Sequence, residues 1–457
     1  MEAGLFRFLR FSLGLEGEAK GLLDGRKGSF DWDACYQFAK RQTLVGVLFD
    51  GIQRLPKELA PARPLLLRWL SDSESIRRRN MRMDRASAYI YNKVCAAGFR
   101  CCILKGQGNA LLYPHPSSRI PGDVDVWVMA NREELRHIAL SLTEGDGSSL
   151  QESLNHIGLT VHGVSVELHS TPALLNSPLH NSRLQRWLKR NADLQCSNRI
   201  ALPNNAGAVA VPTLSFNIIY QLCHLFHHCF YEGVGLRQIV DYYFVLKNTD
   251  ISGNTGEGAG NTDRDEVLLN TDCMDSTDSS SGDFDGDGCF LNTDFTDFTD
   301  RVSGNTDEGC FLLNTDCADF LDSSSGGLGE VDSGGALVAL QEELKWLGLW
   351  EFAGAVMYVL REVMGLDEKR MICAPDERRG RLLLEEIMAG GNFGHYDTRN
   401  HFGQGALWHN IQRFRRDWRM LRFYPSEALS EPLFRVCHFL WRWKQKHTGK
   451  PKERNRN

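Results

Sequence analysis

The chain has 457 residues, 42% of them hydrophobic, which is enough for two or three packed domains rather than one. Its 13 cysteines are odd in number and include no Cys-x-x-Cys pair, a usage that favours a reducing cytoplasm over a disulfide framework. Charges interrupt the first apolar run, and no apolar run reaches about 18 residues, so neither a signal peptide nor a membrane span is expected.

The net charge of −6 hides two regions of opposite sign. Residues 248–335 contain 21 acidic and 2 basic side chains, a net charge of −19, whereas the rest of the chain carries a net charge of +13. A basic folded part suits anionic substrates such as nucleotides. It does not by itself indicate nucleic-acid binding.

Residues 1–98 are predicted to form an N-terminal helical region. Apolar side chains recur at helical spacing near the N-terminus and again from Trp32, where Asp31 is the expected N-cap. A long, polar, arginine-rich helix is expected over Ser71–Val94.

Residues 99–195 have the pattern of a compact α/β unit. The expected elements are a strand at Arg100–Lys105, a helix at Gly108–Tyr113, a strand at Val124–Met129, a helix at Arg132–Leu142 and a hairpin at Leu159–His169. His162-Gly163 lies near the expected hairpin turn.

Helical patterns return in residues 196–247 and 336–457, which we expect to form a C-terminal helical region. Between them, residues 248–335 are rich in Asn, Thr, Asp, Ser and Gly. The segment Leu268–Gly282 recurs as Leu312–Gly326 with three differences. Such a segment is typical of a disordered, low-complexity acidic repeat inserted in a surface loop.

Two acidic residues near the second strand form the most informative pattern. Asp123 and Asp125 are two positions apart, so on a strand they would share one face, with Val124, Val126 and Val128 on the other. Two carboxylates directed at one place repel each other unless a cation lies between them. Mg²⁺ is the usual cation where phosphates are handled, so the pattern predicts a metal site.

A glycine turn and a third carboxylate narrow this interpretation. The turn Lys105-Gly106-Gln107 leads from the first strand into the short helix, and backbone N–H groups in such a turn are suited to phosphate. Glu167 lies in the middle of a predicted strand, where an unpaired buried charge would be costly. Together with Asp123 and Asp125, this arrangement indicates a nucleotidyl-transfer site.

At this point the sequence resembles the polymerase-beta-like nucleotidyltransferase superfamily and, more closely, an uncharacterised bacterial nucleotidyltransferase family. The motifs that carry the resemblance are Leu104-Lys-Gly106, Tyr113-Pro114, Arg119-Ile-Pro-Gly-Asp-Val-Asp125, Glu167-Leu-His169, Gly233-Val-Gly-Leu-Arg-Gln-Ile-Val-Asp241 and Gly391-Asn-Phe-Gly394. The resemblance covers nearly everything except 248–335. The chain departs from the wider superfamily at Gly106-Gln107, where Gly-Ser or Gly-Gly is usual, and in a longer gap before Asp123.

The resemblance implies an α+β fold: a small mixed-sheet nucleotidyltransferase core flanked by N-terminal and C-terminal helical regions, with the disordered acidic insertion. The residues that would be catalytic and hold two Mg²⁺ ions are Asp123, Asp125 and Glu167. The residues that would contact the nucleotide are Lys105, Gly106, Gln107 and Arg119. Glu167 could also help to deprotonate an acceptor hydroxyl. Arg119 could instead be a surface cation, and His169 is expected to be a supporting or core histidine rather than a metal ligand.

Three other patterns are given less specific interpretations. His224-Leu-Phe-His-His228 lacks the Glu of a His-Glu-x-x-His zinc motif, so we expect helix packing or polarity in a substrate cleft. Arg237 and Asp241 are spaced i,i+4 on a helix and are expected to pair. Asp283–Asp294 nearly satisfies an EF-hand loop, but it ends in Asp and lacks flanking helices, so calcium binding is not expected.

The function expected from these residues is Mg²⁺-dependent transfer of a nucleoside monophosphate from an NTP, with ATP favoured, to an acceptor hydroxyl with release of pyrophosphate. A protein or small-molecule acceptor is favoured, nucleic acid is not excluded, and no membrane partner is expected. One alternative is a catalytically inactive, nucleotide-binding regulatory or scaffold protein. Another is a protein whose acidic repeat is the functional part.

Overall fold

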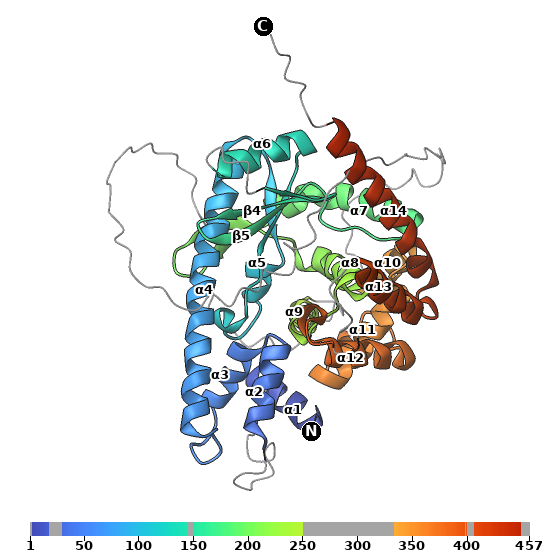
Figure 1. Ribbon diagram of the computed structural model, residues 1–457. Helices are drawn as coiled ribbons and strands as arrows, with labels where there is room; N and C mark the ends of the chain where they lie inside the picture. Colours follow the sequence, from blue (N-terminus) through green and yellow to red (C-terminus); the bar gives the residue numbers. More distant parts are fainter. Residues whose placement is uncertain are drawn as a thin grey trace, which may run out of the picture. The chain divides into compact units, whose positions relative to one another are not determined.

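A computed structural model describes residues 2–17, 30–143, 150–249, 333–397, 399 and 406–448 (Figure 1). The described residues of Met1–Gly253 and Leu313–His438 form one compact unit, and the second unit contains Asn254–Leu312 and Phe439–Asn457. The acidic repeat lies outside the described residues except at its two ends, and the EF-hand-like loop lies outside them entirely.

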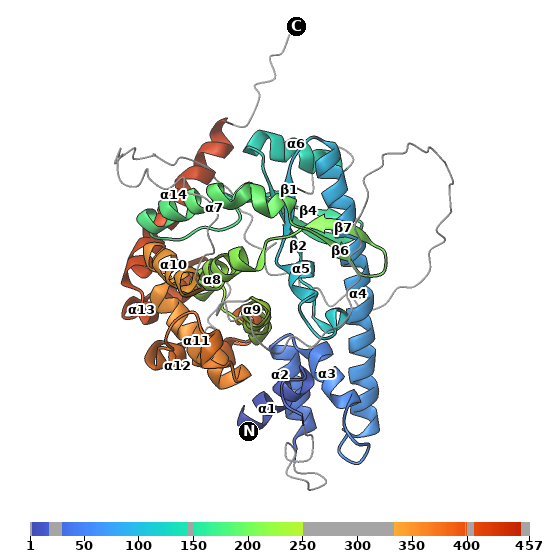
Figure 2. The same cartoon turned by 180° about the vertical axis from the view of Figure 1, so that it is seen from behind.

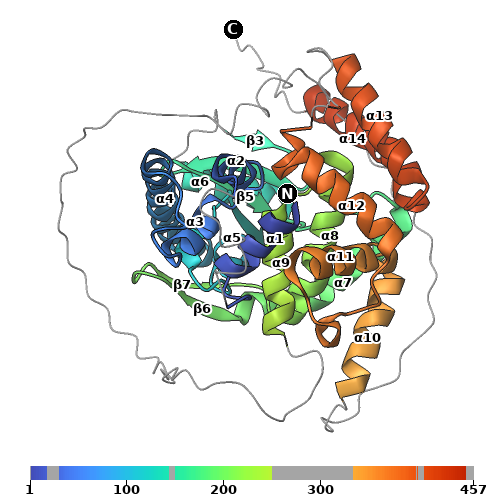
Figure 3. The same cartoon turned by 90° about the horizontal axis from the view of Figure 1, so that it is seen from below.

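The N-terminal region is helical where it is described. Its helices are α1 (Glu2–Ser12), α2 (Trp32–Arg41), α3 (Val45–Gln53) and α4 (Arg63–Ala96). The Asp31 side chain accepts a hydrogen bond from the Ala34 backbone N–H at 2.9 Å and caps α2, as predicted. Helix α3 packs against both α1 and α4, as the view from below shows (Figure 3).

A five-stranded mixed sheet forms the centre of the α/β part, so the predicted α+β class is confirmed. Its strands are β1 (Cys101–Leu104), β2 (Val124–Val128), β3 (Gln151–Glu152), β4 (His156–Val161) and β5 (Val164–His169). Their order across the sheet is β1-β2-β5-β4-β3. Strands β2 and β5 are parallel, whereas the other neighbouring strands are antiparallel.

Neighbouring side chains on a strand point alternately to the two faces of the sheet. On β2, Asp125 and Trp127 share one face, and the Trp127 ring stacks 5.9 Å from Phe216. Phe216 in turn stacks 4.7 Å from Trp187. These two partners belong to α8 (Leu214–Tyr231) and α7 (Pro178–Ser197) respectively. Helix α4 and helix α6 (Arg132–Leu142) also contact the sheet, and Figures 1 and 2 place α4 and α7 on opposite sides of it.

The β4–β5 hairpin has a two-residue turn, His162-Gly163, with φ angles of 49° and 73°. Positive φ at both positions is typical of the tight turns that favour glycine and match the twist of a hairpin. Pairing outward from this turn sets Val161 opposite Val164 and His156 opposite His169. The hairpin predicted from the sequence is therefore present, and it begins three residues earlier than expected.

Several elements were not expected from the sequence. These are the edge strand β3 of the five-stranded sheet, helix α7, and a separate two-stranded sheet of β6 (Arg199–Leu202) and β7 (Gly207–Ala210). The short helix α5 (Gly106–Ala110) starts two residues before its predicted position, and the turn η1 (Pro116–Ser118) follows it. Helix α6 has the predicted bounds, and Asn131 with Glu134 forms a capping box at its start.

The region expected to be helical at residues 196–247 contains the β6–β7 pair followed by two helices, α8 and α9 (Leu236–Asn248). The remaining elements are α10 (Ser333–Trp346), α11 (Trp350–Met364), η3 (Glu368–Arg370), α12 (Glu377–Gly390), η4 (Asn392–Gly394), α13 (Ala406–Leu421) and α14 (Pro425–Thr448). Helix α11 packs against α12, α9, α8 and α1. None of the helices described here is both long enough and apolar enough to span a membrane.

Candidate active site

The turn between β1 and α5 places a lysine at the acidic residues. Lys105 has φ 48° and Gly106 has φ 33°, conformations that L side chains rarely adopt. The Lys105 ammonium lies 3.1 Å from Asp125 Oδ2. A Cβ at Gly106 would lie 3.8 Å from the Asp123 carbonyl oxygen, so the turn runs close to the chain that enters β2.

The sheet brings the three predicted carboxylates together. The parallel register sets Asp125 of β2 opposite Glu167 of β5, and Asp123 directly precedes β2 rather than lying within it. One carboxylate oxygen from each of Asp123, Asp125 and Glu167 lies within 4.8 Å of the other two. Such a separation of oxygen donors allows all three residues to contact one divalent ion or a pair of ions.

The electrostatics of this group also fit a cation. Burial and the Asp125 and Glu167 carboxylates raise the pKa of Asp123 to about 7, although Lys105 opposes the shift. Burial alone would raise the pKa of Asp125, but Lys105 and His169 outweigh it and hold that pKa well below its usual range. Mg²⁺ takes oxygen ligands and relieves such repulsion, so these residues fit the predicted ion.

Two histidines flank the carboxylates. His169 Nε2 lies 3.1 Å from Asp125 Oδ1 and 3.2 Å from Glu167 Oε2, and His156 Nε2 lies 3.6 Å from Glu167 Oε1. Burial would lower the pKa of His169, but hydrogen bonds to both acids raise it to about 9. Burial lowers the pKa of His156 despite the nearby Glu167 carboxylate.

A line of polar groups continues from Lys105 into α8. The Lys105 ammonium donates to His224 Nε2 at 3.2 Å, and His228 Nε2 lies 2.8 Å from the same His224 atom. His228 Nδ1 lies 3.1 Å from the Glu232 carboxylate. Burial and the charge of Lys105 lower the pKa of His224 well below its usual range, so its ring is neutral and accepts this hydrogen bond. Among the described residues, two groups of at least three His, Cys, Asp or Glu donors are close enough to share a metal ion, and these α8 histidines belong to neither group.

Gln107 and Arg119, two of the expected nucleotide contacts, have protein partners instead. The Gln107 amide donates to the Asp84 carboxylate of α4, and both side chains are buried. Arg119 is 4% exposed and donates to the two oxygens of Asp241 at 2.7 and 2.8 Å. The expected pairing of Asp241 with Arg237 is therefore wrong as the main contact, because Asp241 binds Arg119 while Arg237 donates to the Ile120 carbonyl at 2.9 Å.

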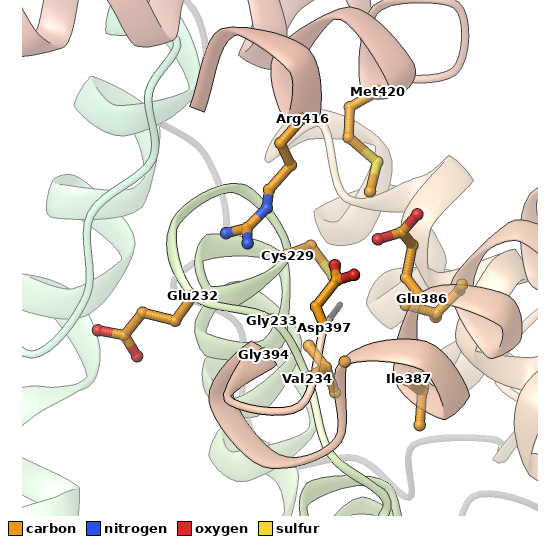
Figure 4. Close-up of a pocket in the computed structure, with 12 residues that line it drawn as sticks. Cys229, Glu232, Gly233, Val234, Glu386, Ile387, Gly394, Asp397, Arg416 and Met420 are labelled. Carbon is orange, nitrogen blue, oxygen red and sulfur yellow. The ribbon is translucent and has the colours of Figure 1, made fainter. Parts of the chain in front are cut away.

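A small cavity lies apart from the carboxylates. Its volume is about 20 Å³, room for one water molecule rather than a nucleotide. Figure 4 shows Arg416, Asp397 and Glu386 around it, whereas the Glu232 side chain points away from it. The carboxylates of the sheet therefore remain the site to which the chemistry points.

Comparison with known proteins agrees with this geometry. Residues 28–255 match a family described as uncharacterised nucleotidyltransferase. The chain belongs to this nucleotidyltransferase family. Among solved structures it is similar to an antigenic nucleotidyltransferase-like protein from Paracoccidioides brasiliensis, with 16% identity, a TM-score of 0.24 and coverage of 36% of this chain and 75% of that chain. No curated protein matches.

Sequence reasoning missed two residues beside the site of this nucleotidyltransferase. Arg79 of α4 is exposed and donates to the Gly122 carbonyl at 3.2 Å, next to Asp123. Desolvation by the surrounding protein and the charge of Arg82 lower the pKa of Arg79, and the charge of Asp123 raises it. His156 could have been found by counting outward from the His162-Gly163 turn, because the hairpin register puts it opposite His169. Nothing in the local pattern distinguished Arg79 from the other arginines of α4.

Proposed function

We propose that this nucleotidyltransferase moves a nucleoside monophosphate from an NTP, ATP being the favoured donor, to an acceptor hydroxyl with release of pyrophosphate, in a Mg²⁺-dependent reaction. The observation that carries the proposal is the meeting of Asp123, Asp125 and Glu167 oxygens within 4.8 Å beside the Lys105 turn. Nothing favours the alternative of an inactive nucleotide-binding regulator, because all three acids are present.

In the proposed reaction the acceptor oxygen bonds to the α-phosphorus while the bond from that phosphorus to the leaving pyrophosphate breaks. Mg²⁺, held in two positions by Asp123, Asp125 and Glu167, would supply charge neutralisation for the attacking and leaving oxygens. Glu167 is the candidate to take the acceptor proton, because its side chain is 29% exposed whereas that of Asp125 is 8% exposed.

The residues expected to contact the nucleotide form two groups: those that lie beside the carboxylates, and those whose side chains are bound to other residues of the protein. Lys105 lies at the carboxylates and could bind a phosphate oxygen, and Gly106 keeps the turn close to Asp123. Arg79 is exposed beside Asp123 and could bind the outer phosphates. Gln107 and Arg119 would act by shaping the turn and the approach to β2, since Asp84 and Asp241 occupy their side chains.

The decisive experiment compares Asp123→Asn and Asp125→Asn with the wild type, following transfer of label from an α-³²P-labelled NTP and the release of pyrophosphate. Each variant is expected to lose metal-dependent turnover while keeping its thermal unfolding transition, since the amide preserves shape but not charge. Asp33→Asn, at an exposed position in α2, is the matched control and should be fully active. Full activity in either site variant would refute the assignment.

The acceptor is proposed to be a protein or a small molecule, with nucleic acid as the remaining class. We place the reaction in the cytoplasm because the cysteine usage favours a reducing compartment. Incubating the enzyme with each labelled NTP and a cell lysate, then separating protein, nucleic acid and small molecules, would identify the labelled pool. Label in the nucleic-acid fraction alone would overturn the preference for the other two classes.

A further inference from the structure

A second set of donor atoms lies beside the three carboxylates on the same face of the sheet. His156 and His169 are directly opposite each other on β4 and β5, and their ring centroids are 5.1 Å apart. Both Nε2 atoms face the Glu167 carboxylate. One donor atom from each of His156, Glu167 and His169 lies within 4.8 Å of the other two.

The separations of these atoms fit a shared ion. Bonds from nitrogen or oxygen to a first-row divalent metal are about 2.0–2.2 Å, so neighbouring ligands lie about 3.0 Å apart at right angles and about 3.4 Å apart in a tetrahedron. The corresponding distances here are 3.2 Å for His169 Nε2 to Glu167 Oε2 and 3.6 Å for His156 Nε2 to Glu167 Oε1. The donor atoms of His156 and His169 lie within 4.8 Å of each other.

The chemistry of these donors differs from that of the carboxylate group. Carboxylates alone suit Mg²⁺ and Mn²⁺, whereas imidazole nitrogen suits Zn²⁺, Cu²⁺, Fe²⁺ and Ni²⁺, and two histidines with one carboxylate form a familiar transition-metal set. Glu167 belongs to both groups, with Oε1 toward His156 and Oε2 toward His169. It is placed to bridge two unlike positions.

We propose that the centre binds two chemically different ions: Mg²⁺ at the Asp123 and Asp125 side, and a first-row transition ion at a position formed by His156, His169 and Glu167. This goes beyond the expectation that His169 only supports the site. It rests on the proposed function for the Mg²⁺ position, but binding of the transition ion can be measured without turnover.

The surroundings of the Nδ1 atoms of His156 and His169 indicate how tightly the transition ion would be bound. The Nδ1 atoms of His156 and His169 are buried and have no hydrogen-bond partner among the described residues, so Nε2 is the nitrogen that each ring offers. Metal-binding histidines are usually oriented by a hydrogen bond from the other nitrogen, and loss of that partner weakens binding about 10–100-fold. We therefore expect an exchangeable ion rather than one retained through purification.

The test uses a limiting amount of Cu²⁺ in excess Mg²⁺ as the probe and pulsed electron paramagnetic resonance as the readout, because ¹⁴N couplings appear only when nitrogen binds the ion. Wild-type protein is expected to bind Cu²⁺ with ¹⁴N couplings. His156→Gln, at a partly exposed position, and His169→Gln should each lose couplings and weaken Cu²⁺ binding about tenfold or more. His137→Gln, exposed on α6, is the matched control and should behave as wild type.

The outcomes separate this inference from the proposed function. Bound Cu²⁺ without ¹⁴N coupling in the wild type, or with unchanged coupling in the histidine variants, would overturn the inference even if nucleotide transfer proceeds with Mg²⁺. Nitrogen-coupled Cu²⁺ in a protein that transfers no nucleotide to any acceptor would leave the inference standing and remove the proposed function. Thermal unfolding in chelator distinguishes loss of a ligand from loss of the fold, and His156→Gln is the milder variant for that purpose.

Discussion

At the scale of single residues, two cations near β2 have different tasks. Lys105 lies against Asp125 at the edge of the carboxylate group, whereas Arg119 is enclosed and makes both of its strongest contacts with Asp241. Tyr113 adds a hydrogen bond to the same Asp241 at 2.6 Å. The Arg119 pair therefore fixes the segment that leads into Asp123, and it leaves phosphate binding to side chains that solvent can reach.

Asp241→Asn tests this structural role of Arg119. The variant leaves a buried guanidinium without its counter-charge, so we expect a loss of about 3–5 kcal/mol in the free energy of unfolding. Replacing both partners, in Arg119→Met/Asp241→Leu, should restore much of the loss because the buried guanidinium is removed together with its counter-charge. Urea unfolding of the three proteins measures the difference, and a stable single variant would contradict the role.

The same pair predicts how stability depends on pH. Burial would raise the pKa of Asp241, but Arg119, Arg237 and Tyr113 outweigh it and lower that pKa below its usual range. A depressed acid stabilises the folded protein above the unfolded pKa, about 3.9, and this contribution is lost as the pH falls through the lower folded value. The difference in stability between wild type and Asp241→Asn should therefore shrink on acidification below about pH 4, and a constant difference would contradict the linkage.

Arg79→Ala tests the proposed phosphate contact. Removing an exposed cation beside Asp123 should raise the KM for the NTP about tenfold or more, since charge-assisted hydrogen bonds contribute about 1.5–3 kcal/mol each, and should leave the unfolding transition in place. Arg78→Ala, a neighbouring exposed position of α4, is the control. Equal kinetics in the two variants would remove Arg79 from the nucleotide site.

At the scale of elements, two glycine-containing segments that are far apart in the sequence pack into each other. A Cβ at Gly235 would lie 2.9 Å from Asn392 Cα, and a Cβ at Gly394 would lie 2.2 Å from the Glu232 carbonyl oxygen. The α8–α9 connection and the η4 turn therefore approach at a distance that only glycine permits. This contact holds the end of α8, which carries His228 and Glu232, against the C-terminal helices.

Gly394→Ala is expected to lower the free energy of unfolding by roughly 2–4 kcal/mol, because Gly394 has φ 68° and its new methyl would meet backbone rather than a movable side chain. Gly390→Ala is the matched control. A Cβ there meets nothing within 4 Å, so stability should be kept or rise by up to about 1 kcal/mol. Equal stability of both variants, measured by thermal and urea unfolding, would contradict the close packing.

Elements with strong local signals were predicted well, and contacts made through space were not. Alternation predicted β2 and β5, and apolar side chains at helical spacing predicted α6 with its observed bounds. The strands β6 and β7 are four residues each, too short for a clear pattern, and α7 is polar along much of its length. The three acids could be named because Asp123 and Asp125 are spaced two apart and Glu167 lies in the middle of a predicted strand. The partners of Gln107 and Arg119 could not be named, since no local pattern links these residues to α4 or α9.

At the scale of the whole molecule, the residues of the site come from segments between α4 and α8. The family match ends at residue 255, so it includes the sheet, α8 and α9 but none of the helices from α10 onward. Helices α10 to α13, and α14 as far as His438, nevertheless belong to the same compact unit, with α11 against α9 and α1. The catalytic part therefore depends on later helices for its packing, although its acids all lie in the matched span.

Replacing residues 253–330 with a flexible Gly-Ser linker tests whether the acidic repeat contributes to the reaction. We expect unchanged transfer activity, because every residue assigned to the site lies before this segment and loop length has a small entropic cost. Label transfer from an α-labelled NTP, with the wild type measured in parallel, provides the comparison. Loss of activity in a variant with a normal unfolding transition would show that the repeat takes part.

The parallel pairing of β2 with β5 has a consequence for how the enzyme is made. Neighbouring parallel strands need a long crossover, so Asp125 meets its partner only after α6 and the whole hairpin have been synthesised. A nascent chain that has not yet released Glu167 from the ribosome carries the aspartates but cannot assemble the centre. Completion of the proposed site therefore waits for β5 to pair with β2.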